Sequence, residues 1–219
     1  MPKKLSLKQF AYQTIKDKIL NCVYMPNSFL NEDLLCEELN ISRTPVRDAL
    51  SRLEQEHLIR ILPKKGFLVA PLSAKEINMV YEGRILLETY ILSTYCQELP
   101  DTVLDHLYDL QEKYYQNIVN QLEDVTLIDN DFHATLTNQC TNRYFLHIIQ
   151  EIENQSCRLR VLSGRISDKR LFASYNEHQL LLEHLRSNRM PEAVEAMKVH
   201  LLNSKEAAFH VFIHGAISL

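Results

Sequence analysis

Residues 40–57, NISRTPVRDALSRLEQEH, constrain the fold of this chain more than any other stretch. Ser42 is placed to cap a helix, because its hydroxyl can accept a hydrogen bond from an N–H of the first turn. Pro45 lies in that first turn, where a missing N–H costs nothing. The apolar residues recur at the spacing of one helical face: Val46, Leu50 and Leu53. The segment therefore predicts a helix with one buried face.

A second short helix is predicted just before it, over residues 31–39, with its leucines turned inward: Leu34, Leu35 and Leu39. Only three residues separate the two helices. The arginines of the second helix lie off its apolar face: Arg43, Arg47 and Arg52. Two short helices, a tight turn and exposed arginines describe a helix-turn-helix, which lays its second helix in the DNA major groove. Spacing alone fits an αα-hairpin in an unrelated bundle equally well.

The flanking residues fit a winged form of this motif. A helix is predicted over 7–22, and two short strands are predicted over 58–62 and 67–70, on either side of a basic Pro-Lys-Lys-Gly turn. Two strands around such a turn form a hairpin, the wing. Lys64 and Lys65 could contact phosphates there. The alternative is an ordinary solvated turn.

The rest of the chain is predicted to be helical. Ser73 opens a capping-box pattern, with glutamate three residues later. Six helices are expected, over 73–97, 101–122, 125–139, 142–163, 168–188 and 191–213. The fold class is therefore mainly α: an N-terminal winged helix-turn-helix domain, 1–72, followed by an all-α helical bundle, 73–219.

Composition narrows the class of protein. Only 4 of the 219 residues are glycine, which argues against Gly-rich phosphate loops and all-β folds. No apolar run reaches the ~18–20 residues that span a bilayer, and the start lacks the apolar core of a signal peptide. A cytoplasmic protein without a membrane partner is expected. The five cysteines have no CxxC spacing, so they are expected to be reduced and buried.

Charge is unevenly distributed. Residues 1–72 carry 11 Lys and Arg against 8 Asp and Glu, whereas the remainder carries 13 against 20. A basic N-terminal segment followed by an acidic remainder is typical of a nucleic-acid-binding protein with a separate second domain. The contrast is modest.

Four polar residues fall on or beside apolar faces of the predicted bundle: Asp129, His133, His178 and His200. Asp129 and His133 are four residues apart, so they project from one side of a helix. One carboxylate and three imidazoles form a ligand set for a divalent transition metal, and Zn, Ni, Mn and Fe all suit it. Taken alone, a core-facing histidine is more often a hydrogen-bonded structural residue than a metal ligand.

Three arginines are candidates for binding an anionic ligand. Arg84 lies on the buried face of the 73–97 helix, where a guanidinium needs an anion. Its partner is either Glu88, four residues on, or the carboxylate of a ligand, which arginine grips with two hydrogen bonds. Arg158 and Arg160 are weaker candidates, with exposure to solvent as the alternative.

With these residues in view, the chain resembles GntR-family transcriptional regulators of the FadR-like subfamily, which carry an FCD-type helical effector domain. The resemblance covers nearly the whole length. Its most specific part is ISRTPVRDALSRLEQEHLI followed by PKKGFLV. In the helical part it rests on RILLE, residues 84–88, on DNDFH, residues 129–133, and on two later histidines, His178 and His200.

The resemblance implies roles for particular residues. DNA contacts fall to Ser42, Arg43, Thr44, Arg47, Lys65 and Gly66, and metal ligation falls to Asp129, His133, His178 and His200. The effector is expected to bind Arg84, Arg158 and Arg160. One departure stands out: some members place an arginine in the second helix to touch DNA, where this chain has Asp33.

The predicted function is therefore that of a homodimeric regulator, not an enzyme. It would bind a palindromic operator in double-stranded DNA, and a small organic acid at the metal would control its affinity. Two rivals remain open. A metal-dependent hydrolytic enzyme would use the same ligand set to activate water, and a helical interaction module would bind protein through its front domain.

Overall fold

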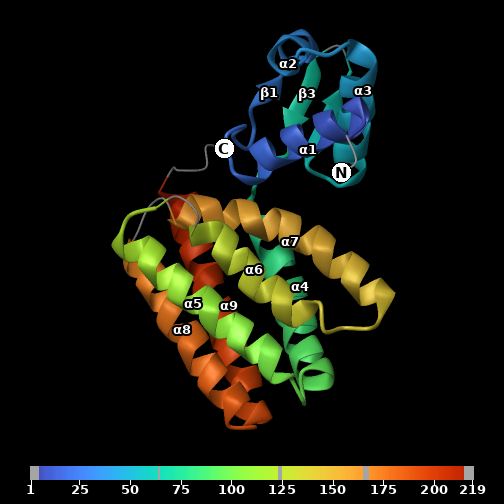
Figure 1. Ribbon diagram of the computed structural model, residues 1–219. Helices are drawn as coiled ribbons and strands as arrows, with labels where there is room; N and C mark the ends of the chain where they lie inside the picture. Colours follow the sequence, from blue (N-terminus) through green and yellow to red (C-terminus); the bar gives the residue numbers. More distant parts are fainter. Residues whose placement is uncertain (1–4, 64, 123–124, 165–167, 215–219) are drawn as a thin grey trace. The chain divides into compact units, whose positions relative to one another are not determined.

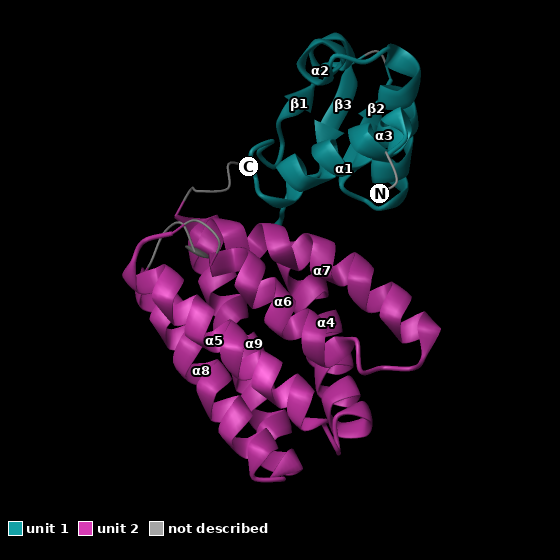
Figure 2. Cartoon of the chain, in the orientation of Figure 1, with its two compact units in different colours: residues 1–73, 217–219 teal, residues 74–216 magenta. Residues whose placement is uncertain are grey.

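The structure is a computed structural model that describes residues 5–63, 65–122, 125–164 and 168–214. The chain divides into two compact units, and the division falls between Ser73 and Ala74 (Figure 2). Each unit has its own buried apolar cluster. The predicted combination of a winged helix-turn-helix and an all-helical domain is confirmed.

The first unit contains three helices and a small sheet (Figure 1). In chain order the elements are α1 (Leu7–Leu20), β1 (Phe29–Leu30), α2 (Glu32–Leu39), α3 (Arg43–Gln55), β2 (Ile59–Leu62) and β3 (Gly66–Val69). The predicted apolar face of α3 is fully buried, and α1 contributes three residues to the same core: Ala11, Ile15 and Ile19. Leu7, at the start of α1, is exposed.

Two asparagines define the ends of α2, the first helix of the helix-turn-helix, and the second one opens the turn to α3. Asn31 caps α2, because its side chain accepts hydrogen bonds from the N–H groups of the first turn. Asn40 ends α2 in the left-handed conformation, with φ 53° and ψ 47°, which asparagine tolerates better than most residues. Ser42 stands at the N-cap position of α3, but its side chain makes no capping hydrogen bond. The predicted cap by the Ser42 hydroxyl is therefore wrong.

The prediction that Leu34 faces inward is also wrong, since its exposed fraction is 62% whereas that of Leu35 is 3%. Adjacent residues point about 100° apart around a helix. A short helix packed on one side therefore buries one of the two leucines and exposes the other.

The wing is a hairpin of β2 and β3, with Arg60 opposite Leu68. A third strand, β1, pairs with the other edge of β3, so the antiparallel order is β1-β3-β2. This two-residue strand was not predicted. Gly66 opens β3 with φ +98°, a backbone conformation that favours glycine. Lys64, one of the predicted wing lysines, lies outside the described residues.

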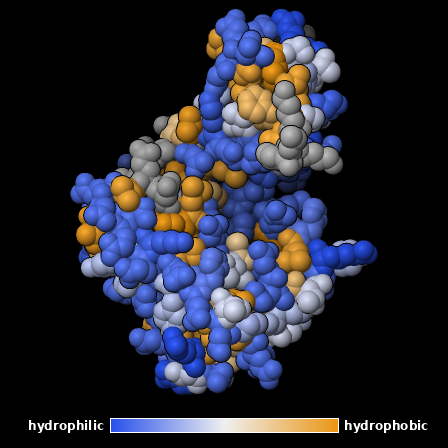
Figure 3. All heavy atoms as spheres, viewed as in Figure 1, coloured by the Kyte–Doolittle hydropathy of each residue, from blue (hydrophilic) through white to orange (hydrophobic). Residues whose placement is uncertain are grey.

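The second unit is helical throughout its described part (Figure 1). Its elements are α4 (Ala74–Tyr95), α5 (Asp101–Val119), α6 (Val125–Thr137), α7 (Arg143–Gly164), α8 (Asp168–Arg186) and α9 (Met190–Ile213). These bounds lie within a few residues of the predicted ones. On the face in Figure 3, hydrophilic side chains cover most of this unit and apolar ones form separate small groups. In the described part of the chain, no helix is both long and apolar enough to cross a bilayer.

None of the five cysteines forms a disulfide in the described part of the chain, and all except Cys36 are buried. The prediction of buried cysteines is confirmed for the other four and wrong for Cys36, which is half-buried. The interior of the second unit holds an unusual number of buried polar residues, among them Arg84, Glu88, Gln111, Asp129, His133, Arg158, His178 and His200. Buried polar groups need partners, so their arrangement points to the functional site.

Candidate metal centre and DNA-binding surface

Three buried imidazoles meet in the middle of the helical unit. His133 comes from α6, His178 from α8 and His200 from α9, and each follows the apolar face of its helix inward. The Nε2 atom of His200 lies 3.3 Å from Nε2 of His178 and 3.2 Å from Nε2 of His133. Nitrogens held about 2.1 Å from one ion are about 3.0–3.4 Å apart. The spacing of the three rings therefore suits ligands of a single ion.

The Asp129 carboxylate lies beside these rings, one turn before His133. Its oxygens are 3.9 Å from Nε2 of His133 and 3.8 Å from Nε2 of His178. Ser174 donates a hydrogen bond to one oxygen at 3.4 Å, and Arg160 Nε lies 3.3 Å from the other. The structure thus brings together all four residues predicted as metal ligands.

Two carboxylates hold the outer edges of two of the rings. The Nδ1 atom of His133 lies 2.7 Å from Glu88 Oε2, and the Nδ1 atom of His200 lies 2.7 Å from Glu177 Oε2. A carboxylate at Nδ1 accepts the proton there and leaves the Nε2 lone pair free for a metal. With the proton assigned to Nδ1, both imidazoles direct the Nε2 lone pair that a metal ligand requires toward the centre of the cluster.

The third ring is held by Gln111 and by stacking. The side-chain amide of Gln111 lies 3.2 Å from Nδ1 of His178, and its oxygen has no hydrogen-bond partner in the described part of the chain. Turning the amide over lets that oxygen accept the Nδ1 proton, an assignment set by the hydrogen-bond network. Phe132 stacks on His178 with ring centroids 4.1 Å apart. His178 then also presents its Nε2 lone pair inward.

Three lone pairs that face one another at such short distances repel unless a cation or a shared proton lies between them. The described residues supply no cationic side chain at that point, since the arginines of the region pair with carboxylates around it. A divalent metal removes this repulsion and uses all three donors. The donor set therefore fits a metal.

The electrostatics favour uncharged rings at His178 and His200 and a charged carboxylate at Asp129. Burial lowers the pKa of His200 to about 4, although the hydrogen bond to Glu177 opposes the shift. Burial also lowers the pKa of His178 well below its ordinary value. Burial, the largest single influence, would raise the pKa of Asp129, but Arg160 together with the three neighbouring histidines outweighs it and the pKa falls. Neutral imidazoles and an ionised carboxylate are the forms that bind metals.

A chain of ion pairs runs beside the ligands. Arg84 Nε lies 2.6 Å from Glu88 and 3.4 Å from Glu153, and Arg160 pairs with Glu153 and with Asp129. Arg84 is fully buried, and Glu88, the partner predicted on its own helix, is the nearer of the two carboxylates. Its two terminal nitrogens have no hydrogen-bond partner among the described residues. Through its ion pair with Glu88, Arg84 fixes the carboxylate that orients His133.

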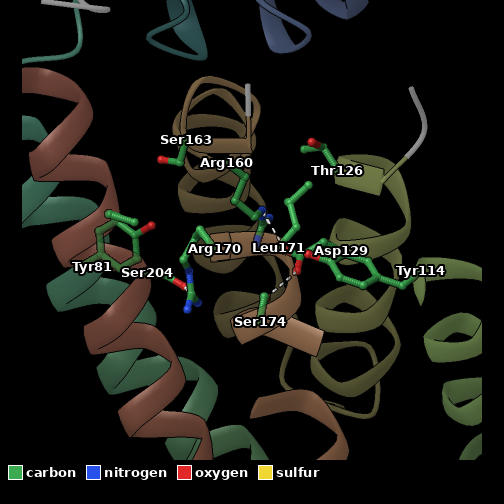
Figure 4. Close-up of a pocket in the computed structure, with 11 residues that line it drawn as sticks. Tyr81, Tyr114, Thr126, Asp129, Arg160, Ser163, Arg170, Leu171, Ser174 and Ser204 are labelled. Atoms are coloured by element: carbon green, nitrogen blue, oxygen red, sulfur yellow. Dashed lines mark hydrogen bonds and ion pairs between the residues drawn. The ribbon is translucent and has the colours of Figure 1, made fainter. Parts of the chain in front are cut away.

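A pocket opens next to Asp129 (Figure 4). It encloses about 420 Å³ of empty space including its mouth. Its lining is mixed, with arginines, tyrosines, hydroxyls and apolar groups: Tyr81, Tyr114, Thr126, Asp129, Arg160, Ser163, Arg170, Leu171, Ser174, Ser204 and Ala207. Arg160 comes from α7 and Arg170 from α8, and both border the pocket beside the carboxylate. Two guanidinium groups suit an anionic ligand.

The three predicted effector arginines are placed differently. Arg160 lines the pocket and is only 10% exposed in its side chain, so the alternative that it faces solvent is wrong. Arg158 is fully buried and bonds Gln155 at 2.7 Å, away from the pocket lining. Arg84 also lies outside that lining. Of the three, only Arg160 is positioned to touch a ligand in the pocket.

Three residues beside the proposed metal ligands or in the pocket were not predicted from the sequence: Gln111, Arg170 and Glu177. Arg170 makes two hydrogen bonds to Glu177, at 2.8 and 2.7 Å, and one to Ser204. Glu177 adjoins His178 in sequence, and Arg170 is two helical turns before Glu177. Gln111 was detectable as a polar residue on the apolar face of α5, between Leu107 and Tyr114.

The predicted DNA contacts gather at the start of α3. Four polar side chains there are exposed: Ser42, Arg43, Thr44 and Arg47. Lys65, in the wing, is exposed as well. Arg43 bonds Asp33 through Nε at 3.0 Å and through Nη2 at 2.8 Å, and Arg47 bonds Glu32 through Nε at 3.0 Å. Both arginines are thus held by carboxylates of α2 while remaining accessible.

Two family models match the chain. The model for bacterial regulatory proteins of the gntR family matches residues 7–69, and the FCD domain matches residues 79–203. The chain is a GntR-family regulator with an FCD domain. It is therefore a DNA-binding transcriptional regulator in which the helical domain is the effector domain.

Relatives of this GntR regulator agree with that assignment. The uncharacterised HTH-type regulator YdhC of Bacillus subtilis is 26% identical over 93% of this chain and 92% of its own length. The HTH-type transcriptional repressor GlaR of Escherichia coli is 25% identical over 88% and 91%. The structure of Escherichia coli McbR/YncC shares the fold, with a TM-score of 0.84 at 19% identity over 95% and 99% of the two chains. The two sequence relatives are both named as HTH-type transcriptional regulators.

Proposed function

We propose that this regulator binds a divalent transition metal in its helical domain and senses a small organic acid there. Asp129, His133, His178 and His200 are the proposed ligands. The observation that carries the proposal is the position of His200 Nε2, 3.3 Å from Nε2 of His178 and 3.2 Å from Nε2 of His133, with ligand atoms of all three residues within 4.8 Å of one another. The partners at the three Nδ1 positions support it, because they free the inward lone pairs.

A bound metal would supply a positive charge that attracts a carboxylate, and Zn, Ni, Mn and Fe all accept this ligand set. Arg160 and Arg170 would hold the rest of the anion at the wall of the pocket. Tyr114, Ser174 and Ser204 offer hydroxyl groups that suit a hydroxylated acid. Arg84 would act through Glu88 to orient His133 rather than touch the ligand.

For DNA, we propose that a homodimer binds a palindromic operator, with half-sites spaced by the dimer. Arg43 and Arg47 would reach base edges or flanking phosphates. Ser42, Thr44 and Lys65 would contact the backbone, and Gly66 would let the wing turn. The exposure of these side chains at one end of α3 and in the wing supports these roles.

Elemental analysis of the full-length chain, purified without chelator, tests the metal proposal. We expect about one divalent transition metal for each chain. His178→Ala should lower the metal content strongly, because the third imidazole is lost. Adding a chelator to the wild type should lower its thermal stability, since a ligand that binds only the folded state stabilises that state.

His184→Ala is the matched control, because His184 lies on the same helix as His178 but outside the cluster. It should keep its metal. Absence of metal from the wild type, with no rise in stability when Zn, Ni, Mn or Fe is added, would refute the metal site. Equal metal content in His178→Ala and His184→Ala would contradict the assigned ligands.

A further inference from the structure

The helix before the recognition helix carries an acidic start. In a helix-turn-helix, that first helix crosses the DNA backbone. Here the first turn of α2 presents Glu32 and Asp33, so negative charge stands where phosphates would approach. Neither the metal site nor the effector pocket explains these two carboxylates.

The two carboxylates hold their arginines in different ways. Asp33 Oδ1 lies 3.0 Å from Nε and 2.8 Å from Nη2 of Arg43, so it occupies one whole edge of that guanidinium. Glu32 accepts from Arg47 through Nε alone. The end of each guanidinium, formed by Nη1 and Nη2, can still face a guanine edge. Arg43 is held through two donors and Arg47 through one, so Asp33 restrains and neutralises Arg43 more than Glu32 does Arg47.

The strength of the Arg43–Asp33 pair decides what it does. The side chains are 63% and 62% exposed, and an exposed ion pair is weak and screened by salt. The stabilisation from this ion pair is comparable to that from a single exposed contact between arginine and phosphate. A directional, two-bond contact with a base is stronger and can displace Asp33.

We propose that Asp33 is a specificity-determining residue that withholds Arg43 from phosphates. On DNA of arbitrary sequence, Arg43 stays paired with Asp33, so it releases no counterion and adds little affinity. On the operator, the contact with a base draws Arg43 away. Asp33 therefore weakens non-specific binding more than specific binding.

Asp33→Asn in the full-length chain tests this inference, because it keeps the shape and removes the charge. The probes are a site selected by the wild type from random oligonucleotides and a scrambled duplex of the same length. Binding is measured by fluorescence anisotropy across a range of salt. Affinity for the scrambled duplex should rise about three- to tenfold, and its salt slope should steepen by about one for each docked recognition helix.

Affinity for the selected site should rise less, so the ratio of the two affinities falls. An equal rise on both duplexes, or no change on the scrambled one, would overturn the proposal. Neither outcome depends on metal or effector, so failure here is separate from failure of the metal site.

Asp48→Asn is the control, because it also removes one carboxylate and one surface ion pair, with Lys8 at 2.8 Å. It should leave the ratio unchanged. If it alters the ratio as Asp33→Asn does, net charge is the cause and the proposal is wrong. In an Arg43→Gln background, Asp33→Asn should have no effect on the ratio, since the arginine that it would release is gone.

Discussion

At the scale of single residues, each imidazole of the cluster has one ring nitrogen engaged and the other directed inward. Glu88 and Glu177 accept at Nδ1 of His133 and His200. These carboxylates are in turn fixed by Arg84 and Arg170. A buried histidine serving only as packing needs no such second layer, and outer partners of this kind orient metal ligands.

Arg47 gives a prediction at this scale. Arg47→Ala should lower affinity for the selected operator by about 1–3 kcal/mol if the side chain reads a base, and should lower affinity for scrambled DNA less. Competition binding on the two duplexes measures both losses. Arg143→Ala, which removes an equally charged exposed residue from the helical domain, should change neither. Equal weakening on both duplexes would show that Arg47 only contacts phosphate.

The residues that could be found from sequence are those that break an expected pattern. His133, His178 and His200 interrupt apolar stripes, so periodicity marked them as candidates, and the family resemblance then favoured them as metal ligands. Their partners Glu88 and Glu177 were harder to assign, because a glutamate on a helix is ordinary and its partner lies on another helix. The predicted Ser42 cap is wrong because a favourable residue at a helix start does not ensure the capping hydrogen bond.

At the scale of elements, α4 and α7 pack closely at Gly83. A Cβ atom built on Gly83 would lie 2.6 Å from Cδ1 of Ile152 and 3.5 Å from its Cγ1. The first distance is a clash and the second is an ordinary contact. Glycine inside a helix costs up to about 1 kcal/mol relative to alanine, so the close approach of α7 explains its place here.

A double-mutant cycle tests that packing. In an Ile152→Val background, which lacks Cδ1, Gly83→Ala should stabilise the helical domain by up to about 1 kcal/mol. In the wild-type background the same change should be less stabilising or destabilising, because Ile152 must move. Urea unfolding followed by circular dichroism gives the four stabilities. Identical effects in both backgrounds would show that Ile152 moves away without cost.

The helices could be predicted closely because local signals mark their ends. Pro100, Asn142 and Pro191 lie at or within a residue of observed helix starts, and Asp101 and Asp168 each open a helix. Strand β1 could not be predicted, because it has two residues and exists only by pairing with β3, about 40 positions later. A non-local pairing leaves no periodic signal in so short a segment.

At the scale of the whole molecule, the function joins two units with separate cores. The residues proposed to contact DNA lie in one unit, and the proposed metal ligands and the pocket residues lie in the other. An acid can alter DNA binding only if it binds one arrangement of the protein more tightly than another. DNA must also bind these two arrangements with different affinities. The effect on affinity is then a coupling free energy shared by the two sites.

Because the coupling free energy is the same for both sites, it gives a prediction that does not require the two conformations to be known. If an acid found by thermal-shift screening of small carboxylates changes operator affinity by a given factor, a saturating operator must change affinity for the acid by the same factor. Isothermal titration of the acid into free and operator-bound protein measures the second factor. Arg160→Gln, which removes a charged group from the pocket wall, should weaken binding of the acid in both titrations. If an acid changes operator affinity but the operator does not change affinity for the acid, the two sites are not coupled through a shared conformational equilibrium. The acid would then act in another way, for example by removing the metal.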